Sequence, residues 1–147
     1  MRRASWKRPA RLVLVASIVF AVGAVIVRAA EEPDKAAQMA AERWLALVDA
    51  GSYGDSYDAA AAVFKKALTK EQWIEAVGKA RGPFGKLDSR RLLGSKLVTE
   101  LPNAPKGEYD VIQYEAKFPG ATAIETITPM KDSDGSWRVS GYYIRPR

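Results

Sequence analysis

The fold is decided by residues 108–131, which read EYDVIQYEAKFPGATAIETITPMK. Apolar and more polar side chains alternate in the first half of this stretch, where Ile112, Tyr114, Ala116 and Phe118 stand between Gln113, Glu115 and Lys117. A period of two is typical of a strand with one buried face. The dipeptide Pro119-Gly120 then favours a tight turn, and a second strand-like run follows from Ala123 to Lys131. Because the connection is short, the stretch predicts an antiparallel hairpin.

Two further strand-like runs flank this hairpin, from about Ser89 to Thr99 and from Trp137 to Ile144. Turn-forming residues separate them from it, in segments 102–107 and 132–135. A period of two along the last run places Trp137, Val139, Gly141 and Tyr143 on one face. The second half of the chain therefore predicts a curved antiparallel sheet of about four strands.

The first half of the chain has helical spacing instead. Asp34 is suited to be the N-cap of a first helix that Gly51 ends, and a second helix is predicted from about Ser56 to Leu68. Thr69 and Gln72 make a capping box for a third helix, which ends at segment 82–85. Helices first and strands second indicate an α+β fold, with three N-terminal helices packed on the sheet. We expect residues 35–147 to form one domain, after a short spacer at 30–34.

The excess positive charge lies entirely in the first 28 residues, which hold six of the 23 Lys and Arg and none of the 17 Asp and Glu. The remaining residues carry 17 Lys and Arg against 17 Asp and Glu, so their formal net charge is zero. The net charge of +6 therefore does not indicate a nucleic-acid-binding surface, and no nucleic-acid partner is expected.

The order of residues at the start is that of an export signal. A basic segment, 1–11, precedes an apolar run at 12–27, and the small residues Ala29 and Ala30 follow. As a helix the run would span ~24 Å, which is short of the ~30 Å hydrocarbon core of a bilayer. We expect residues 1–29 to be a signal peptide or, if uncleaved, an N-terminal membrane anchor. Either places the domain outside the cytoplasm, periplasmic or secreted, or held at the inner membrane through residues 12–27.

The chain contains neither Cys nor His. Disulfides, cysteine nucleophiles, histidine-dependent triads and most zinc sites are therefore excluded. No calcium loop, phosphate-binding glycine loop or nucleophile elbow is complete in the sequence. We expect no metal site and no cofactor.

Glu125 is the strongest single candidate for chemistry, because it stands between Ala123 and Ile127 on one strand face. A carboxylate drawn into an apolar layer needs a cationic partner, or its pKa rises as in a general base. Arg81, Arg90 and Arg91 could each neutralise it, and Arg91 is our first choice. We predict a structural ion pair rather than a catalytic acid.

Other candidate side chains have two readings each. Tyr114, Tyr142 and Tyr143 could bring phenols into the interior of the fold, where a tyrosine beside an acid can support isomerase-like chemistry, or could simply pack the core. Because Tyr142 and Tyr143 are adjacent, they must face opposite sides of a strand. Arg81 could bind an anion at the loop that follows it, or could complement the dipole of its helix. Trp137 is expected to be a core anchor whose replacement by Ala costs ~3–5 kcal/mol.

Several motifs in order carry a family resemblance. They are 41–51 (AERWLALVDAG), 70–73 (KEQW), 81–85 (RGPFG), 125–130 (ETITPM) and 137–143 (WRVSGYY). Over about residues 35–144 the chain resembles the bacterial domain-of-unknown-function family four-zero-one-nine. More loosely it is similar to the nuclear-transport-factor-two-like cone folds. The resemblance implies a bacterial exported protein and supplies no catalytic residues.

We expect a non-catalytic exported domain that binds a small ligand or a protein partner. One alternative is an envelope scaffold that forms a homodimer through its sheet. The other is a cofactor-free lyase or isomerase that uses Glu125 with a tyrosine.

Overall fold

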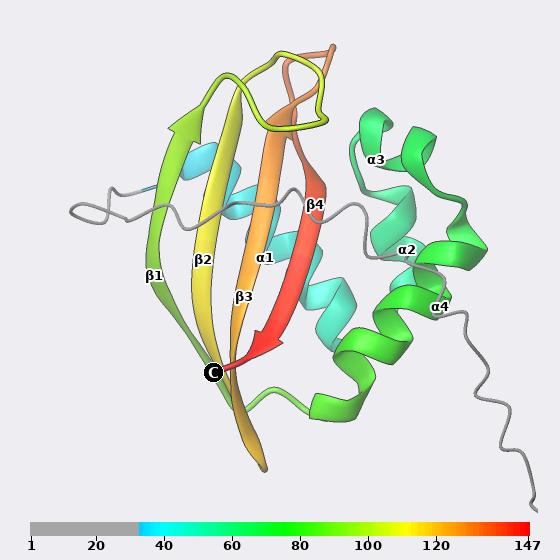
Figure 1. Ribbon diagram of the computed structural model, residues 1–147, viewed down its shortest axis with the longest axis vertical. Coiled ribbons are helices and arrows are strands. Elements are labelled where there is room, and N and C mark those ends of the chain that lie inside the picture. Colours follow the sequence, from blue (N-terminus) through cyan, green and yellow to red (C-terminus); the bar gives the residue numbers. More distant parts are fainter. Residues whose placement is uncertain (1–32) are drawn as a thin grey trace, which may run out of the picture.

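The computed structural model describes residues 33–147 and has an α+β fold (Figure 1). Four strands form one open sheet in the order β1-β2-β3-β4, and each neighbouring pair is antiparallel. Their bounds are β1 Ser89–Val98, β2 Tyr109–Phe118, β3 Ala121–Lys131 and β4 Trp137–Pro146. The predicted class and the four antiparallel strands are confirmed.

Four α-helices precede the sheet in the part of the chain that the structure describes: α1 Lys35–Asp49, α2 Tyr53–Asp58, α3 Ala62–Ala67 and α4 Lys70–Arg81. The carboxylate of Asp34 caps α1 by accepting from the amides of Ala36 and Ala37. Thr69 and Gln72 form the predicted capping box of α4, and a 3₁₀ turn, Gly82–Phe84, follows that helix.

The single helix predicted from Ser56 to Leu68 is wrong, because two short helices, α2 and α3, occupy this region. The chain leaves the helical conformation at Ala61, which has an extended backbone (φ −62°, ψ 156°). There the Ala61 amide donates to the Val139 carbonyl of β4 at 2.8 Å. A bond to the sheet thus replaces the helical bond at this point, which periodicity within the helix cannot indicate.

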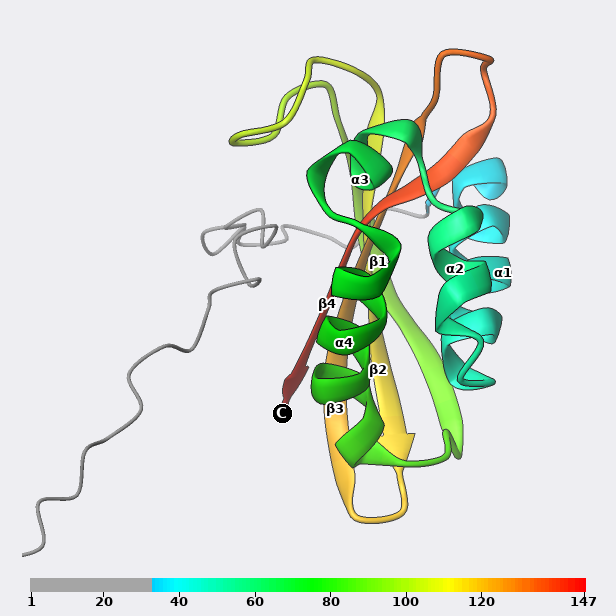
Figure 2. The ribbon, with the colours of Figure 1, turned by 90° about the vertical axis from the view of Figure 1, so that its right-hand side faces the viewer.

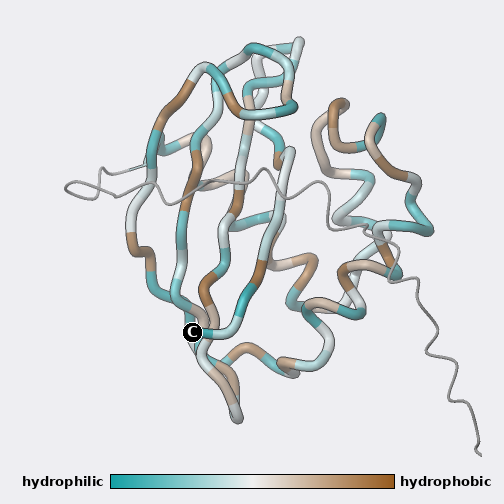
Figure 3. The backbone as a smooth tube through the Cα atoms, viewed as in Figure 1, coloured by the Kyte–Doolittle hydropathy of each residue, from teal (hydrophilic) through white to brown (hydrophobic). Residues whose placement is uncertain are grey.

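One face of the sheet is covered and the other has no described helix over it. Helix α1 lies across the covered face, and α3 and α4 lie beside the edge strand β4 (Figures 1 and 2). We call these the helix face and the open face. Hydrophobic and hydrophilic residues alternate along the strands, as a sheet with two different faces requires (Figure 3).

The main core lies between α1 and the helix face. It contains the buried rings of Trp44, Phe64 and Trp73, packed against Ile112, Ile127 and Val139 of the sheet. The rings of Trp44 and Trp73 lie 5.5 Å apart, and both indole N–H groups donate to Ser56, one to its carbonyl and one to its hydroxyl. Trp137 is outside this cluster and only partly buried, so its predicted role as a core anchor is wrong.

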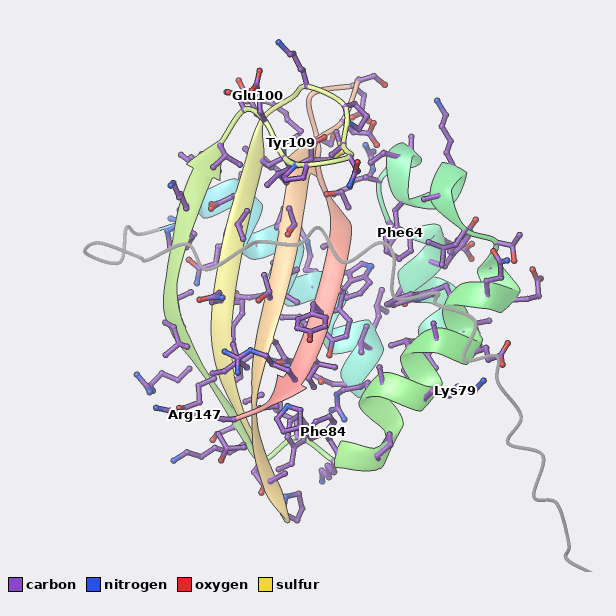
Figure 4. All side chains as sticks on the ribbon, viewed as in Figure 1. Phe64, Lys79, Phe84, Glu100, Tyr109 and Arg147 are labelled. Atoms are coloured by element: carbon purple, nitrogen blue, oxygen red, sulfur yellow. The ribbon has the colours of Figure 1, made fainter. Side chains whose placement is uncertain are left out.

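The two ends of the sheet are built differently. Tyr109 marks one end, where the connection between β1 and β2 folds over it, and Arg147 marks the other (Figure 4). Among residues 33–147 no helix is long and apolar enough to cross a bilayer. The predicted signal or anchor, 1–29, lies outside the described residues.

Candidate functional site

Five side chains from five elements meet in one hydrogen-bonded cluster, which we call the ion network. Its members are Asp49 of α1, Arg81 of α4, Arg90 of β1, Glu125 of β3 and Tyr142 of β4. Two arginines face two carboxylates, so the network is formally neutral. It ties the C-terminal ends of two helices to three strands.

Glu125 is the most buried member, with no exposed surface. Its Oε2 accepts from Arg90 Nε at 2.7 Å, and its Oε1 accepts from Tyr142 Oη at 2.8 Å. Both carboxylate oxygens therefore have a donor. The expected pairing of Glu125 with an arginine is found.

The choice of Arg91 as that partner is wrong. Side chains alternate along β1, so Arg90 points to the helix face and Arg91 to the open face. Arg91 instead donates to Glu115 of β2 at 2.9 Å. The sequence offers a clue, since Leu92 on the helix face is two residues from Arg90, but the adjacent Leu93 makes that clue ambiguous.

Asp49 joins the two arginines of the network. It accepts from Arg90 through both oxygens, at 2.7 and 3.0 Å, and from Arg81 Nη2 at 3.1 Å. A carboxylate at the C-terminal end of a helix opposes the helix dipole, and the two guanidinium groups offset that effect. An acid in this unfavourable position was the signal in the sequence that could have identified Asp49.

Arg81 is nearly buried, with 3% of its surface exposed. Besides Asp49 it donates to the Gly85 carbonyl at 2.6 Å, and its guanidinium carbon lies 4.4 Å from the centre of the Phe118 ring. The residue therefore fastens the loop after α4 onto the sheet. These contacts occupy the group that the sequence suggested for an anion site.

Of the two adjacent candidates, Tyr142 reaches Glu125 and Tyr143 does not. The pairing of β3 with β4 shifts between Thr128/Gly141 and Pro129/Val139, so Ser140 is an extra residue in β4. This bulge puts Val139 and Tyr142 on the helix face and leaves Tyr143 42% exposed. The strict period of two that the sequence predicted for this strand is therefore wrong.

Tyr114, the other candidate, pairs in register with Glu125 and is buried, but it makes no hydrogen bond to that carboxylate. Its phenol has no hydrogen-bond partner among the described residues. Burial raises the pKa of Tyr114 to about 12. The phenol is therefore a neutral core group at physiological pH.

The protonation states in the network follow from its contacts. Burial lowers the pKa of the Arg90 guanidinium, but hydrogen bonds to Asp49 and Glu125 outweigh burial and raise that pKa above its ordinary value. Burial, with the Glu125 carboxylate beside it, raises the pKa of Tyr142 well above its ordinary value. Arg90 therefore stays charged and Tyr142 stays a donor throughout the physiological range.

A hollow of 390 Å³, open to solvent, lies apart from the network. It lies between α1 and the beginning of β4, and its lining residues are Ala40, Arg43, Trp44, Leu47, Ala59, Ser136, Trp137, Arg138 and Val139. None of the five network residues is among them. Within residues 33–147 no three acidic side chains come together as metal ligands would.

The comparisons with known proteins identify the family. The profile of a family described as "Protein of unknown function (DUF4019)" matches residues 40–142. The chain belongs to this family. No curated protein and no solved structure matches it significantly. All five residues of the ion network lie within the DUF4019 match, whereas the looser resemblance to cone folds stays a prediction.

Proposed function

We propose that this DUF4019 protein is an exported, non-catalytic binding domain whose ligand site is the hollow between α1 and β4. The observation that carries the proposal is that the candidate catalytic acid and the hollow lie apart, whereas an active site would combine them. The only acid that the sequence suggested for catalysis is held in the ion network, and the hollow contains no residue of that network.

The bonding of Glu125 supports a structural role. A general base needs a free oxygen within hydrogen-bond reach of its substrate. Both oxygens of Glu125 already accept from Arg90 and Tyr142, and the side chain has no exposed surface. A substrate would have to displace one of two buried donors to reach it.

The hollow has the character of a ligand site. Its volume is within the range of ~300–1,000 Å³ that is common for small-molecule sites. Its walls are mostly apolar, and two arginines and one serine provide the polar groups. Trp137, which the structure leaves partly buried, would gain contact area with an occupant.

The first 29 residues support export. A reporter that is active only outside the cytoplasm, fused after Arg147, should give signal in a bacterial host. Replacement of apolar residues within 12–27 by charged ones should abolish that signal. A cytoplasm-only reporter that works at the same position would contradict export.

Ligand binding can be tested on the full chain by fluorine NMR after labelling with 5-fluorotryptophan. The chain has four tryptophans, and each resonance is assigned by a Trp→Phe variant. Octan-1-ol, a small apolar probe, should shift the resonances of Trp137 and Trp44, which both line the hollow, and leave that of Trp73 in place. If neither octan-1-ol nor octanoate moves the Trp137 resonance, the proposed function is wrong.

Catalysis is the competing outcome. A Glu125→Gln protein that keeps its stability but loses turnover of a compound that the native protein converts would favour the lyase or isomerase. The homodimeric scaffold would be favoured by a mass that doubles with concentration in analytical ultracentrifugation.

A further inference from the structure

The charge of the hollow is carried by two arginines with different surroundings. Arg138 is held by Asp134 through two hydrogen bonds, at 2.8 and 2.7 Å, and lies 3.5 Å from Asp132. Its charge is therefore balanced by two carboxylates of the neighbouring turn. Arg43 projects from the middle of α1, is exposed, and pairs with no carboxylate within residues 33–147.

No acid is among the described residues that line the hollow, so Arg43 leaves it with a net positive charge. The apolar lining comes mainly from one stripe of α1 and from β4. On α1, Arg43 is three residues from Ala40 and four from Leu47, so these three lie along one side of the helix. Trp44 is likewise four residues from Ala40 and three from Leu47. The indole N–H of Trp44 already donates to the Ser56 carbonyl at 2.7 Å, so this lining residue offers only its apolar ring to an occupant.

We infer that the hollow binds a small free molecule with an apolar body and one anionic group, and that Arg43 pairs with the anion. This inference rests on the proposed function and names its ligand class. An apolar body would cover Trp137, Leu47 and the two alanines, while a carboxylate at the rim would reach the guanidinium of Arg43. A guanidinium suits a carboxylate because its donors match both oxygens.

The experiment compares octanoate with octan-1-ol, which share an apolar chain and differ in charge. Titrations of the 5-fluorotryptophan-labelled full chain follow the Trp137 resonance. Octanoate should bind about two- to fivefold more tightly than octan-1-ol, as an exposed charge pair allows. Arg43→Gln should remove this preference by weakening octanoate alone, and Arg43→Lys should restore part of it.

Arg145→Gln is the matched control, because Arg145 is also exposed and pairs with no carboxylate in the described part of the chain. It removes the same charge without touching the hollow and should leave both affinities unchanged. An unshifted resonance of Trp73, which is buried in the main core and does not line the hollow, will show that the variants keep the fold.

Two results would overturn the inference while leaving the proposed function intact. One is equal affinity for octanoate and octan-1-ol, and the other is an Arg43→Gln protein that binds octanoate as the native protein does. A Trp137 shift that occurs with anionic phospholipid vesicles but not with monomeric octanoate would overturn it as well. If the Trp137 resonance does not shift with either octanoate or octan-1-ol, the proposed function itself is wrong.

Discussion

The two faces of the sheet each bury one glutamate, and the two glutamates differ in what surrounds their partners. Glu125 on the helix face binds Arg90, whose side chain is 13% exposed. Arg90 also binds Asp49, and Asp49 in turn binds the buried Arg81. Glu115 on the open face pairs with Arg91 and Arg147, whose side chains are 66% and 61% exposed. The two carboxylates are almost equally hidden, with 0% and 5% of their surface exposed.

This comparison shows that burial of a carboxylate does not by itself determine how much its ion pair contributes to the stability of the fold. On the open face, water solvates the guanidinium groups and weakens the pairing, as in an ordinary surface ion pair. On the helix face both partners are withdrawn from water, so loss of one leaves an uncompensated charge. The ion network should therefore dominate the charge-dependent part of the stability.

The largest effect should follow the loss of Arg90. Arg90→Met leaves Asp49 without its bidentate partner and Glu125 without its cation, and should lower the free energy of unfolding by ~3–5 kcal/mol. The matched variant Arg91→Met removes the neighbouring arginine and should cost ~0–1 kcal/mol. Urea denaturation of both variants measures the difference.

A double-mutant cycle of Arg90→Met with Glu125→Gln separates pairing from packing. The double variant should be more stable than the sum of the single effects predicts, because the two buried charges leave together. Arg91→Met with Glu125→Gln should show no coupling. A cycle that assigns the coupling to Arg91 would contradict the network.

Tyr142 and Tyr143 test the bulge of β4. Tyr142→Phe removes a hydrogen bond to the buried Glu125 carboxylate and should cost ~1.5–3 kcal/mol. Tyr143→Phe alters an exposed ring and should change stability by less than ~0.5 kcal/mol. Urea denaturation of the two variants measures both effects. Equal effects at both positions would contradict the register assigned to β4.

These two pairs also show what could be predicted from the sequence. Alternation and turn residues predicted the strands, and Glu125 was predicted to need an arginine, because these features follow from local patterns. The identity of its partners was not predictable, because it depends on pairing between strands. The bulge at Ser140 puts Tyr142, and not Tyr143, on the same face as Val139. In β1, Leu93 is an extra residue between the paired Leu92 and Gly94, so alternation along the sequence does not indicate which face Arg90 is on.

In the helical region, too, local features could be predicted from the sequence and long-range contacts could not. Capping residues predicted the beginnings of α1 and α4, since a cap acts within a few residues. The break between α2 and α3 depends on a hydrogen bond from Ala61 to Val139, 78 residues later in the chain. Asp49 was missed because its two arginines come from α4 and β1, although its place at the end of α1 was a warning.

Glu115 should show the weaker electrostatics of the open face. Glu115→Gln should cost ~0–1 kcal/mol, and high salt should reduce that cost further, because ions screen its solvated arginine partners. The cost of Glu125→Gln should persist in high salt. Denaturation at low and high sodium chloride concentration measures both, and a Glu115→Gln cost of 3 kcal/mol or more, insensitive to salt, would make the two faces equivalent.

The smallest effect at neutral pH is expected for Tyr114, whose buried phenol donates to no described group. Tyr114→Phe should therefore leave stability at pH 7 within about 0.5 kcal/mol of native or raise it slightly. Tyr109→Phe on the same strand should cost more, ~0.5–1.5 kcal/mol, because the Tyr109 hydroxyl donates to the Pro105 carbonyl at 2.6 Å.

The effect of Tyr114→Phe on stability should change at alkaline pH. Burial raises the pKa of Tyr114 to about 12, whereas an unfolded tyrosine ionises near ~10, so the folded state holds the proton more tightly between these values. Its contribution is thus complete below about pH 10 and is lost as the pH rises toward 12. Tyr114→Phe should flatten the fall of the melting temperature over that range, although Tyr142 retains part of it. An unchanged slope would mean that the Tyr114 phenol is solvated.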